Sequence, residues 1–85
     1  MTYELRYTAD AERGIADMPV RERRTLLTKL ERLALDPYAM PGVQRLQGRD
    51  GYRLRVGDYR AVYLLEDQQL LVVVIRVAHR REVYR

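Results

Sequence analysis

Residues 51–63, which read GYRLRVGDYRAVY, decide the fold. Apolar and basic side chains alternate on both sides of Gly57-Asp58, and a period of two is typical of half-buried β-strands. A glycine–aspartate pair between two such runs predicts a tight hairpin turn. Arg53 and Arg55 share one face of the first strand, because alternate residues of a strand point the same way. This stretch therefore predicts a β-hairpin with an apolar face and a basic face.

Two further strands are expected around this hairpin. Residues 2–7 alternate and predict a short strand at the N-terminus. Residues 70–77 are almost entirely apolar and β-branched, as expected for a central strand that is covered on both faces. The turn at residues 66–68 places this strand next to the strand that precedes it.

A pair of helices is expected between the first strand and the hairpin. Apolar residues recur at helical spacing from about residue 8 to 18 and from about residue 20 to 35, where they form one stripe. Pro19 separates the two helices, and Pro37 ends the second one. Because the connection is short, the helices should form an antiparallel hairpin. The stripe consists of Leu26, Leu27, Leu30, Leu33 and Ala34.

The expected fold class is α+β in the order βααβββ. A mainly antiparallel four-stranded sheet carries the helical hairpin on one face. Residues 37–50 contain two prolines and two glycines and are expected to form a loop. A chain of 85 residues supports one hydrophobic core, so residues 1–85 should form a single domain.

The composition excludes several classes of protein. A hydrophobic fraction of 47% with 33% charged residues is typical of a globular domain. The absence of cysteine excludes disulfide scaffolds, thiolate zinc sites and cysteine nucleophiles, and a single histidine disfavours any other transition-metal site. No apolar run approaches the roughly 20 residues that span a bilayer, and the N-terminus shows no signal pattern. We therefore expect a cytoplasmic protein without membrane association, metal or other cofactor.

The positive charge lies in the second half of the chain. Residues 1–42 hold seven basic and seven acidic residues, whereas residues 43–85 hold nine arginines and five acidic residues. A codon bias explains why Lys29 is the only lysine, but it does not explain this segregation. The arginine fork matches phosphate groups and stacks on bases, so the second half is expected to form a surface that faces an anionic partner.

If the last three strands are neighbours in the sheet, their arginines lie together on the face opposite the helices, near His79 and Tyr84. Like charges that gather without partners raise the electrostatic energy of the fold, so they indicate an anionic ligand. The alternative is a solvated face with surface ion pairs, which contribute only about 0–1 kcal/mol each. The expected cluster is Arg53, Arg55, Arg60 and Arg80, with Arg81 as a further member, and the alternative partners are Asp50, Asp58, Glu66 and Glu82.

Three segments resemble the RelE branch of the RelE/ParE toxin superfamily. They are LQG at 46–48, GYRLRVGDYRAVY at 51–63 and VAHRREVY at 77–84. The paired strands and the terminal H-R-R-x-V-Y are the specific part of this resemblance. The N-terminal strand and the leucine-rich helix also occupy matching places, so the resemblance covers nearly the whole chain.

The resemblance implies a toxin of a type II toxin–antitoxin pair that a small, RelB-like antitoxin neutralises. RelE-like toxins enter the ribosomal A site and cut the mRNA there without a metal. The 2′-hydroxyl attacks the adjacent phosphate and leaves a 2′,3′-cyclic phosphate. The implied partners are therefore the antitoxin, the ribosome and mRNA.

The resemblance also implies roles for individual residues. Arg53 and Arg55 match a pair of basic strand residues, which are usually lysines in the family. Arg60 matches the arginine that stabilises the phosphate, Arg80 the basic residue after the last strand, and Tyr84 a tyrosine that stacks on a base. Because arginine is a poor general base, its presence at the paired positions leaves the proton acceptor open.

His79 is a candidate proton shuttle because histidine ordinarily exchanges protons near neutral pH. The alternative is a histidine at the strand end that is bonded to the backbone, and Tyr84 could likewise be a terminal aromatic that closes the edge of the core. The candidate catalytic residues are Arg53, Arg55, Arg60, His79, Arg80 and Tyr84, and the candidate RNA-binding residues are Arg53, Arg55, Arg76, Arg81 and Arg85.

Two rival functions stay open at this point. One is a ParE-like toxin that binds DNA gyrase and lacks nuclease activity, and the other is a passive basic RNA-binding module. Arg60, Arg80 and Tyr84 favour the nuclease. In all toxin readings, an apolar groove along the 26–35 helix or at a sheet edge should bind an antitoxin helix or strand.

Overall fold

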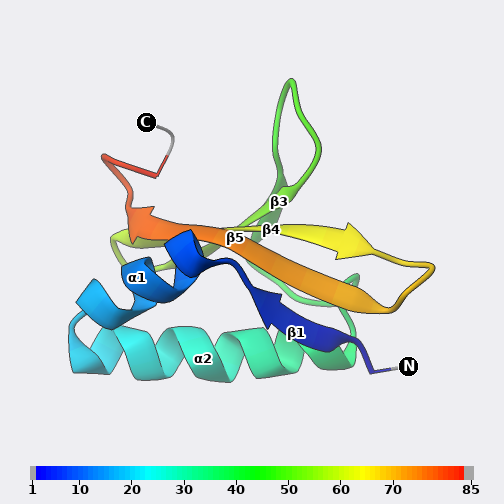
Figure 1. Cartoon of the computed structure of the whole chain (residues 1–85), viewed down its shortest axis with the longest axis horizontal. Coiled ribbons are helices and arrows are strands. Elements are labelled where there is room, and N and C mark those ends of the chain that lie inside the picture. The colour runs from blue at the N-terminus through cyan, green and yellow to red at the C-terminus, as the bar shows by residue number, and fades with distance from the viewer. Residues whose placement is uncertain (1, 84–85) are drawn as a thin grey trace.

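Five strands form one sheet in the order β1-β5-β4-β3-β2 within residues 2–83, the part of the chain that this computed structural model describes (Figure 1). Strands β1 and β5 are parallel, and the other neighbours are antiparallel. The expected α+β class, the helical hairpin and the mainly antiparallel sheet are confirmed. The elements are β1 (Glu4–Tyr7), α1 (Ala9–Asp17), α2 (Val20–Leu35), β2 (Val43–Arg45), β3 (Tyr52–Val56), β4 (Tyr59–Glu66) and β5 (Leu71–His79).

The expected number of four strands is wrong, because β2 lies inside the segment that was expected to be a loop. Its three residues pair with β3, and Gln44 stands opposite Arg53. A run this short cannot show a clear alternation in the sequence. It forms because β3 would otherwise present unpaired backbone groups at the edge of the sheet.

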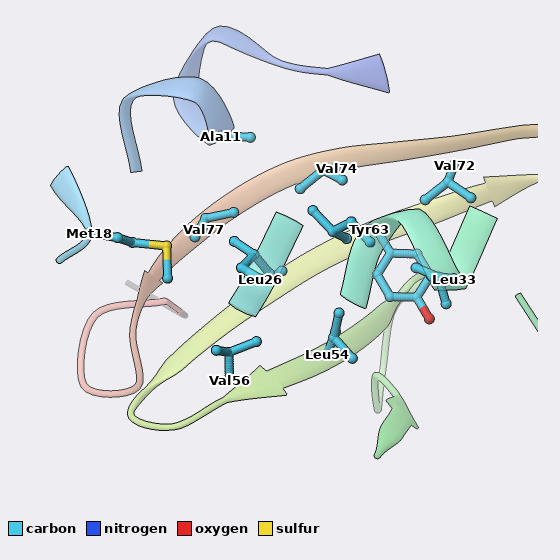
Figure 2. Packing of buried hydrophobic residues seen from close by; sticks show 12 residues of the cluster. Ala11, Met18, Leu26, Leu33, Leu54, Val56, Tyr63, Val72, Val74 and Val77 are labelled. Atoms are coloured by element: carbon cyan, nitrogen blue, oxygen red, sulfur yellow. The ribbon is translucent and has the colours of Figure 1, made fainter. Parts of the chain in front are cut away.

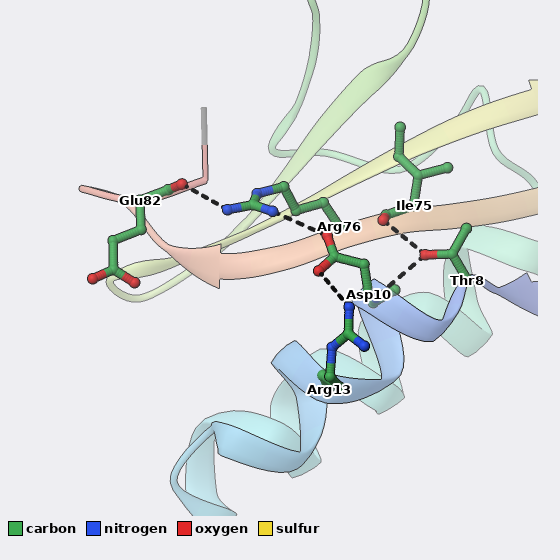
Figure 3. Close-up of polar contacts among 7 residues, drawn as sticks. Thr8, Asp10, Arg13, Ile75, Arg76 and Glu82 are labelled. Atoms are coloured by element: carbon green, nitrogen blue, oxygen red, sulfur yellow. Dashed lines mark hydrogen bonds and ion pairs between the residues drawn. The ribbon is translucent and has the colours of Figure 1, made fainter. Parts of the chain in front are cut away.

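The start of α1 is fixed against β5 by one side chain (Figure 3). Thr8 is the N-cap, and its Oγ1 accepts a hydrogen bond from the Ala11 amide at 3.1 Å and donates one to the Ile75 carbonyl at 2.8 Å. Further along the helix, a Cβ atom at position 14 would lie 1.8 Å from the carbonyl oxygen of Val77. Glycine at this position therefore lets α1 cross β5 at very short range.

The core lies between the helices and one face of the sheet (Figure 2). The apolar stripe of α2 is buried as expected, except for Leu27, which is 37% exposed. The side chain of Tyr63 is fully buried and stacks on Tyr52, with ring centroids 5.5 Å apart. The main contributors from the sheet are Leu54, Val56, Ala61, Tyr63, Val72, Val74 and Val77.

The other face of the sheet, called the outer face below, is partly covered by the turn that follows β5 (Figure 1). Val62 lies on this face opposite Arg53 and Arg76 and is nevertheless 0% exposed. Val83 in the turn is 1% exposed, and the Glu82 carbonyl accepts a hydrogen bond from Arg76. The described end of the chain thus packs onto the outer face beside Arg76.

Among residues 2–83, no helix has both the length and the apolar character that crossing a membrane requires.

Candidate nucleic-acid interface

Three arginines from two strands share the outer face. Arg53 and Arg55 alternate with core residues along β3, so both point away from the helices. Arg60 of β4 is the direct cross-strand partner of Arg55. Like charges that stand directly opposite on one face destabilise a sheet, so the fold maintains this arrangement against a local electrostatic cost.

These arginines line one pocket of about 340 Å³, called the arginine pocket below. The side chain of Arg55 is exposed, and within residues 2–83 it makes no hydrogen bond or ion pair. An exposed cation of this kind is open to an anionic ligand. The lining residues are Gly42, Val43, Gln44, Arg53, Arg55 and Arg60.

Two of the guanidinium groups are held by hydrogen bonds inside the protein. Nη1 of Arg60 donates to the carbonyls of Gly57 at 2.8 Å and Tyr59 at 2.9 Å. Nη2 of Arg53 donates to Oε1 of Gln44 on β2. These bonds fix the positive groups in advance, and fixed donors stabilise developing charge better than mobile ones.

Arg80 lies at the same turn that holds Arg60. Its backbone amide donates to the Asp58 carbonyl at 2.7 Å, and its Nε lies 3.8 Å from Oδ1 of Asp58. Both side chains are more than half exposed, and exposed pairs of this kind contribute about 0–1 kcal/mol. A phosphate group could therefore displace the carboxylate at little cost. Arg80 is not among the residues that line the arginine pocket.

His79 lies on the opposite face of the sheet from these arginines. Its ring meets the ring of Tyr59 edge-on at 5.6 Å, and Tyr59 packs against the core on the helix side. Its Nδ1 accepts a hydrogen bond from the Arg81 amide at 3.3 Å. The structure does not bring His79 into the arginine pocket, and this geometry favours the backbone-bonded histidine.

Arg76 is engaged inside the fold (Figure 3). It forms an ion pair with Asp10 at 3.0 Å, and it donates to the Glu82 carbonyl at 3.1 Å. It thereby ties α1 to the turn after β5. Arg81 is exposed in that turn, away from the lining of the arginine pocket. The remaining candidates, Tyr84 and Arg85, lie outside the described residues.

Tyrosines away from the arginine pocket have perturbed pKa values. A hydrogen bond to the Asp67 carboxylate raises the pKa of Tyr38 to about 12, and the same carboxylate raises the pKa of Tyr3. Burial raises the pKa of Tyr63. Within the described residues, no three His, Asp or Glu side chains gather as metal ligands would.

The sequence interpretation missed the contribution of β2 to the pocket. Gln44 holds Arg53, and Gly42 and Val43 form part of the wall. These residues lie in a segment rich in proline and glycine, where no periodic pattern marks a strand. The only signal was that the basic half of the chain begins at residue 43.

The fold and the basic outer face together define the class of protein, an α+β toxin domain of the RelE/ParE superfamily. Residues 5–84 match the family described as the ParE toxin of the type II toxin–antitoxin system parDE. This match covers most of the chain, and the chain therefore belongs to that family.

Individual relatives agree with this assignment. Toxin RelG of Mycobacterium tuberculosis is 29% identical over 86 residues, which cover 100% of this chain and 99% of RelG. A chain of the intact Escherichia coli RelBE toxin–antitoxin complex is 29% identical with a TM-score of 0.77, covering 91% of this chain and 95% of that one. The RelE–RelB complex of Pyrococcus horikoshii has a TM-score of 0.82 at 24% identity, covering 96% and 99%, and supports the fold alone.

Proposed function

We propose that this toxin is a metal-independent endoribonuclease that cleaves mRNA in the ribosomal A site. The observation that carries the proposal is the arginine pocket, where Arg53, Arg55 and Arg60 meet on the outer face. Relationship to RelE and RelG supports it. The cytoplasm follows as the site of action, because the substrate is a translating ribosome.

The reaction we propose is transphosphorylation within the RNA. The 2′-oxygen forms a bond to phosphorus, and the bond between phosphorus and the 5′-oxygen breaks. The upstream product ends in a 2′,3′-cyclic phosphate. Water takes the proton of the 2′-hydroxyl and supplies one to the departing 5′-oxygen, so the protein needs no base among its arginines.

The protein supplies fixed positive charge for this reaction. Arg60 is held by the turn carbonyls and, together with Arg80, stabilises the charge that develops on the phosphate oxygens. One well-placed donor of this kind lowers the barrier by about 3–4 kcal/mol. Arg53 and Arg55 lower the pKa of the 2′-hydroxyl and hold the flanking backbone. A base-stacking role for Tyr84 stays a prediction.

The partner that restrains this activity should be a small RelB-like antitoxin. The related E. coli structure is a toxin–antitoxin complex. We assign the antitoxin to an open pocket of about 360 Å³ where α1 and α2 meet, whose apolar surface comes from Tyr7, Ile15 and Leu27; of the 26–35 helix face predicted from the sequence, it includes only Leu27. An amphipathic antitoxin helix could place its apolar side chains there.

Primer extension on programmed ribosomes tests the proposal. Incubation with the toxin should produce new mRNA ends inside the A-site codon, and a 2′-deoxynucleotide at the cleaved position should abolish them. A supercoiling assay with DNA gyrase serves as the comparison. Intact mRNA together with inhibited supercoiling would replace the proposal with the gyrase-binding function.

A further inference from the structure

Arg76 in β5 joins two parts of the molecule that are far apart in the sequence (Figure 3). Its Nη1 forms an ion pair with Oδ2 of Asp10 at 3.0 Å, and its Nη2 donates to the Glu82 carbonyl at 3.1 Å. Asp10 lies in the first turn of α1, and Glu82 lies in the turn of residues 80–83, called the terminal turn below. The side chain of Arg76 therefore forms a bridge between helix α1 and the terminal turn.

Arginine is suited to this bridge, although the bridge has a cost. A planar guanidinium offers separate N–H groups to two partners, whereas a lysine ammonium acts as a point charge. The Nε atom of Arg76 is buried and makes no hydrogen bond within residues 2–83, and a buried donor without a partner destabilises a fold. The rest of β5 from Leu71 to Val77 is apolar. The two bonds of the guanidinium group are therefore the property that distinguishes arginine from an apolar residue at this position.

The terminal turn is held at both of its ends. At the first end, the Arg80 amide donates to the Asp58 carbonyl at 2.7 Å. At the second end, where the bridge arrives, the amides of Glu82 and Val83 donate to the His79 carbonyl at 2.8 and 3.1 Å, and the Val83 side chain is 1% exposed. The side chain of Arg80 is more than half exposed. Its position therefore depends on the backbone of the turn.

We propose that Arg76 and Asp10 are positioning residues of the nuclease, which hold the terminal turn so that Arg80 reaches the transferring phosphate group. The inference rests on the proposed function, because that function assigns Arg80 to the charge on the phosphate oxygens. Arg76 acts through the turn and does not contact the RNA, since both of its Nη groups are bound inside the protein. A displacement of about 1 Å can lower a rate on the order of 10²-fold. This role differs from the RNA binding that the sequence predicted for Arg76.

Hydrogen exchange of backbone amides tests the bridge without any substrate. The variants are Arg76→Gln, Asp10→Asn, which keeps Arg76 in place, and the control Arg13→Gln. Arg13 is the other partner of Asp10, at 3.4 Å, and its side chain is 73% exposed, so its removal leaves the bridge intact. The amides of Glu82 and Val83 should exchange several-fold faster in the first two variants than in wild type and the control. Unchanged exchange in both variants would overturn the inference, and Asp10→Asn carries all measurements if Arg76→Gln does not fold.

Cleavage on programmed ribosomes measures the effect on catalysis. Arg76→Gln should lower kcat about tenfold, because the terminal turn keeps its backbone anchors but loses its exact position. The substrate concentration for half-maximal rate should stay unchanged. Asp10→Asn should lower kcat by a smaller factor, Asp10→Glu, which keeps the carboxylate, should retain most of the wild-type rate, and Arg13→Gln should match wild type. A raised half-saturation with unchanged kcat in Arg76→Gln would overturn the inference and assign Arg76 to RNA binding.

A double-mutant cycle separates positioning from a general loss of stability. If Arg76 acts through Arg80, Arg76→Gln should have little further effect on kcat in the Arg80→Gln background, because residues that act as a unit are not additive. An effect as large in that background as in wild type would overturn the inference.

The outcomes also separate this inference from the proposed function. Cleavage by wild type, with the exchange and kcat of Arg76→Gln and Asp10→Asn unchanged, would overturn the positioning role and keep the nuclease. Failure of wild type to cleave would reject the nuclease and the positioning role together. Faster exchange in Arg76→Gln would then identify the bridge as a link that serves the fold alone.

Discussion

Arg55 and Arg60 stand opposite each other on neighbouring strands, and within residues 2–83 no carboxylate pairs with Arg55. Like charges at such positions destabilise a sheet by about 0.2–1 kcal/mol. A residue that served only the fold would not need to be basic here. The cost is understandable if an anion binds between the two side chains.

Replacing Arg55 by glutamine should separate folding from function. Arg55→Gln should raise the free energy of unfolding by a few tenths of a kcal/mol up to about 1 kcal/mol, because it removes the opposed charge. It should also lower mRNA cleavage at least tenfold. Urea unfolding and primer extension measure the two quantities. Arg24→Gln on α2 is the control, and a loss of stability in Arg55→Gln would contradict the interpretation.

His79 has a side chain suited to acid–base catalysis, but it lies outside the arginine pocket. Its ring contacts Tyr59 on the helix side of the sheet. His79→Gln should therefore change the cleavage rate by no more than about threefold, well below the roughly 10²–10⁴-fold contribution of general acid–base catalysis. The shape of the pH–rate profile should also stay unchanged. Loss of one limb of that profile would return His79 to the mechanism.

At the scale of elements, the contact of α1 with β5 depends on one glycine. Helix propensity alone suggests that Gly14 weakens α1, since glycine costs about 1 kcal/mol relative to alanine. The structure explains its presence, because a Cβ atom would lie 1.8 Å from the Val77 carbonyl oxygen. Glycine at position 14 thus lowers the helix propensity of α1 but allows α1 to pack closely against β5.

Substitution at this position gives a result whose sign is informative. Gly14→Ala should lower the free energy of unfolding by about 1–3 kcal/mol, because α1 must move away from β5 to relieve the overlap. Helix propensity alone would predict a gain of up to about 1 kcal/mol. Thermal or urea unfolding distinguishes the two, and a stabilised variant would contradict the close approach.

The elements that could be predicted from the sequence are those with a clear local period. The 51–63 hairpin, the two helices and the stripe of α2 are examples. Strand β2 has three residues and no such period. The parallel pairing of β1 with β5 joins the two ends of the chain, and no local pattern reports a contact of that range.

The candidate site was predictable only in part, for a reason that lies in β5. The cluster of Arg53, Arg55 and Arg60 follows from strict alternation across the hairpin. In β5 the register shifts, because Val62 pairs with Arg76 while Tyr63 pairs with Val74. This bulge reverses the faces beyond it, so that His79 turns toward the helices. Because residues 70–77 are almost entirely apolar, their sequence shows no alternation from which the position of the bulge could be predicted.

At the scale of the whole molecule, one carboxylate connects segments that are far apart in the sequence, at the end of the sheet opposite the Gly57-Asp58 turn. Asp67, in the turn between β4 and β5, accepts hydrogen bonds from the hydroxyl of Tyr3 at 2.9 Å and from that of Tyr38 at 2.5 Å. It therefore links the N-terminal segment to the segment that follows α2. This link should be sensitive to deprotonation of either tyrosine.

The pH dependence follows from the direction of the pKa shift. The hydrogen bond to Asp67 raises the pKa of Tyr38 to about 12 in the folded protein, above the value near 10 of an unfolded chain. The stabilisation is present in full below about pH 10 and is lost as the pH rises toward 12. Urea unfolding should be measured from about pH 9 to about pH 11.5, a range that begins below the unfolded pKa and approaches the folded one. Over this range the free energy of unfolding should fall more steeply for wild type than for Tyr38→Phe. Parallel curves would contradict the link.

The central claim is that fixed guanidinium groups on the outer face stabilise the transition state of RNA cleavage. The most direct measurement is the single-turnover cleavage rate on programmed ribosomes for wild type, Arg60→Ala and the control Arg24→Ala, with circular dichroism to verify folding. We predict a fall of about 10²–10³-fold for Arg60→Ala and an unchanged rate for Arg24→Ala. A folded Arg60→Ala variant that cleaves at the wild-type rate would contradict the account.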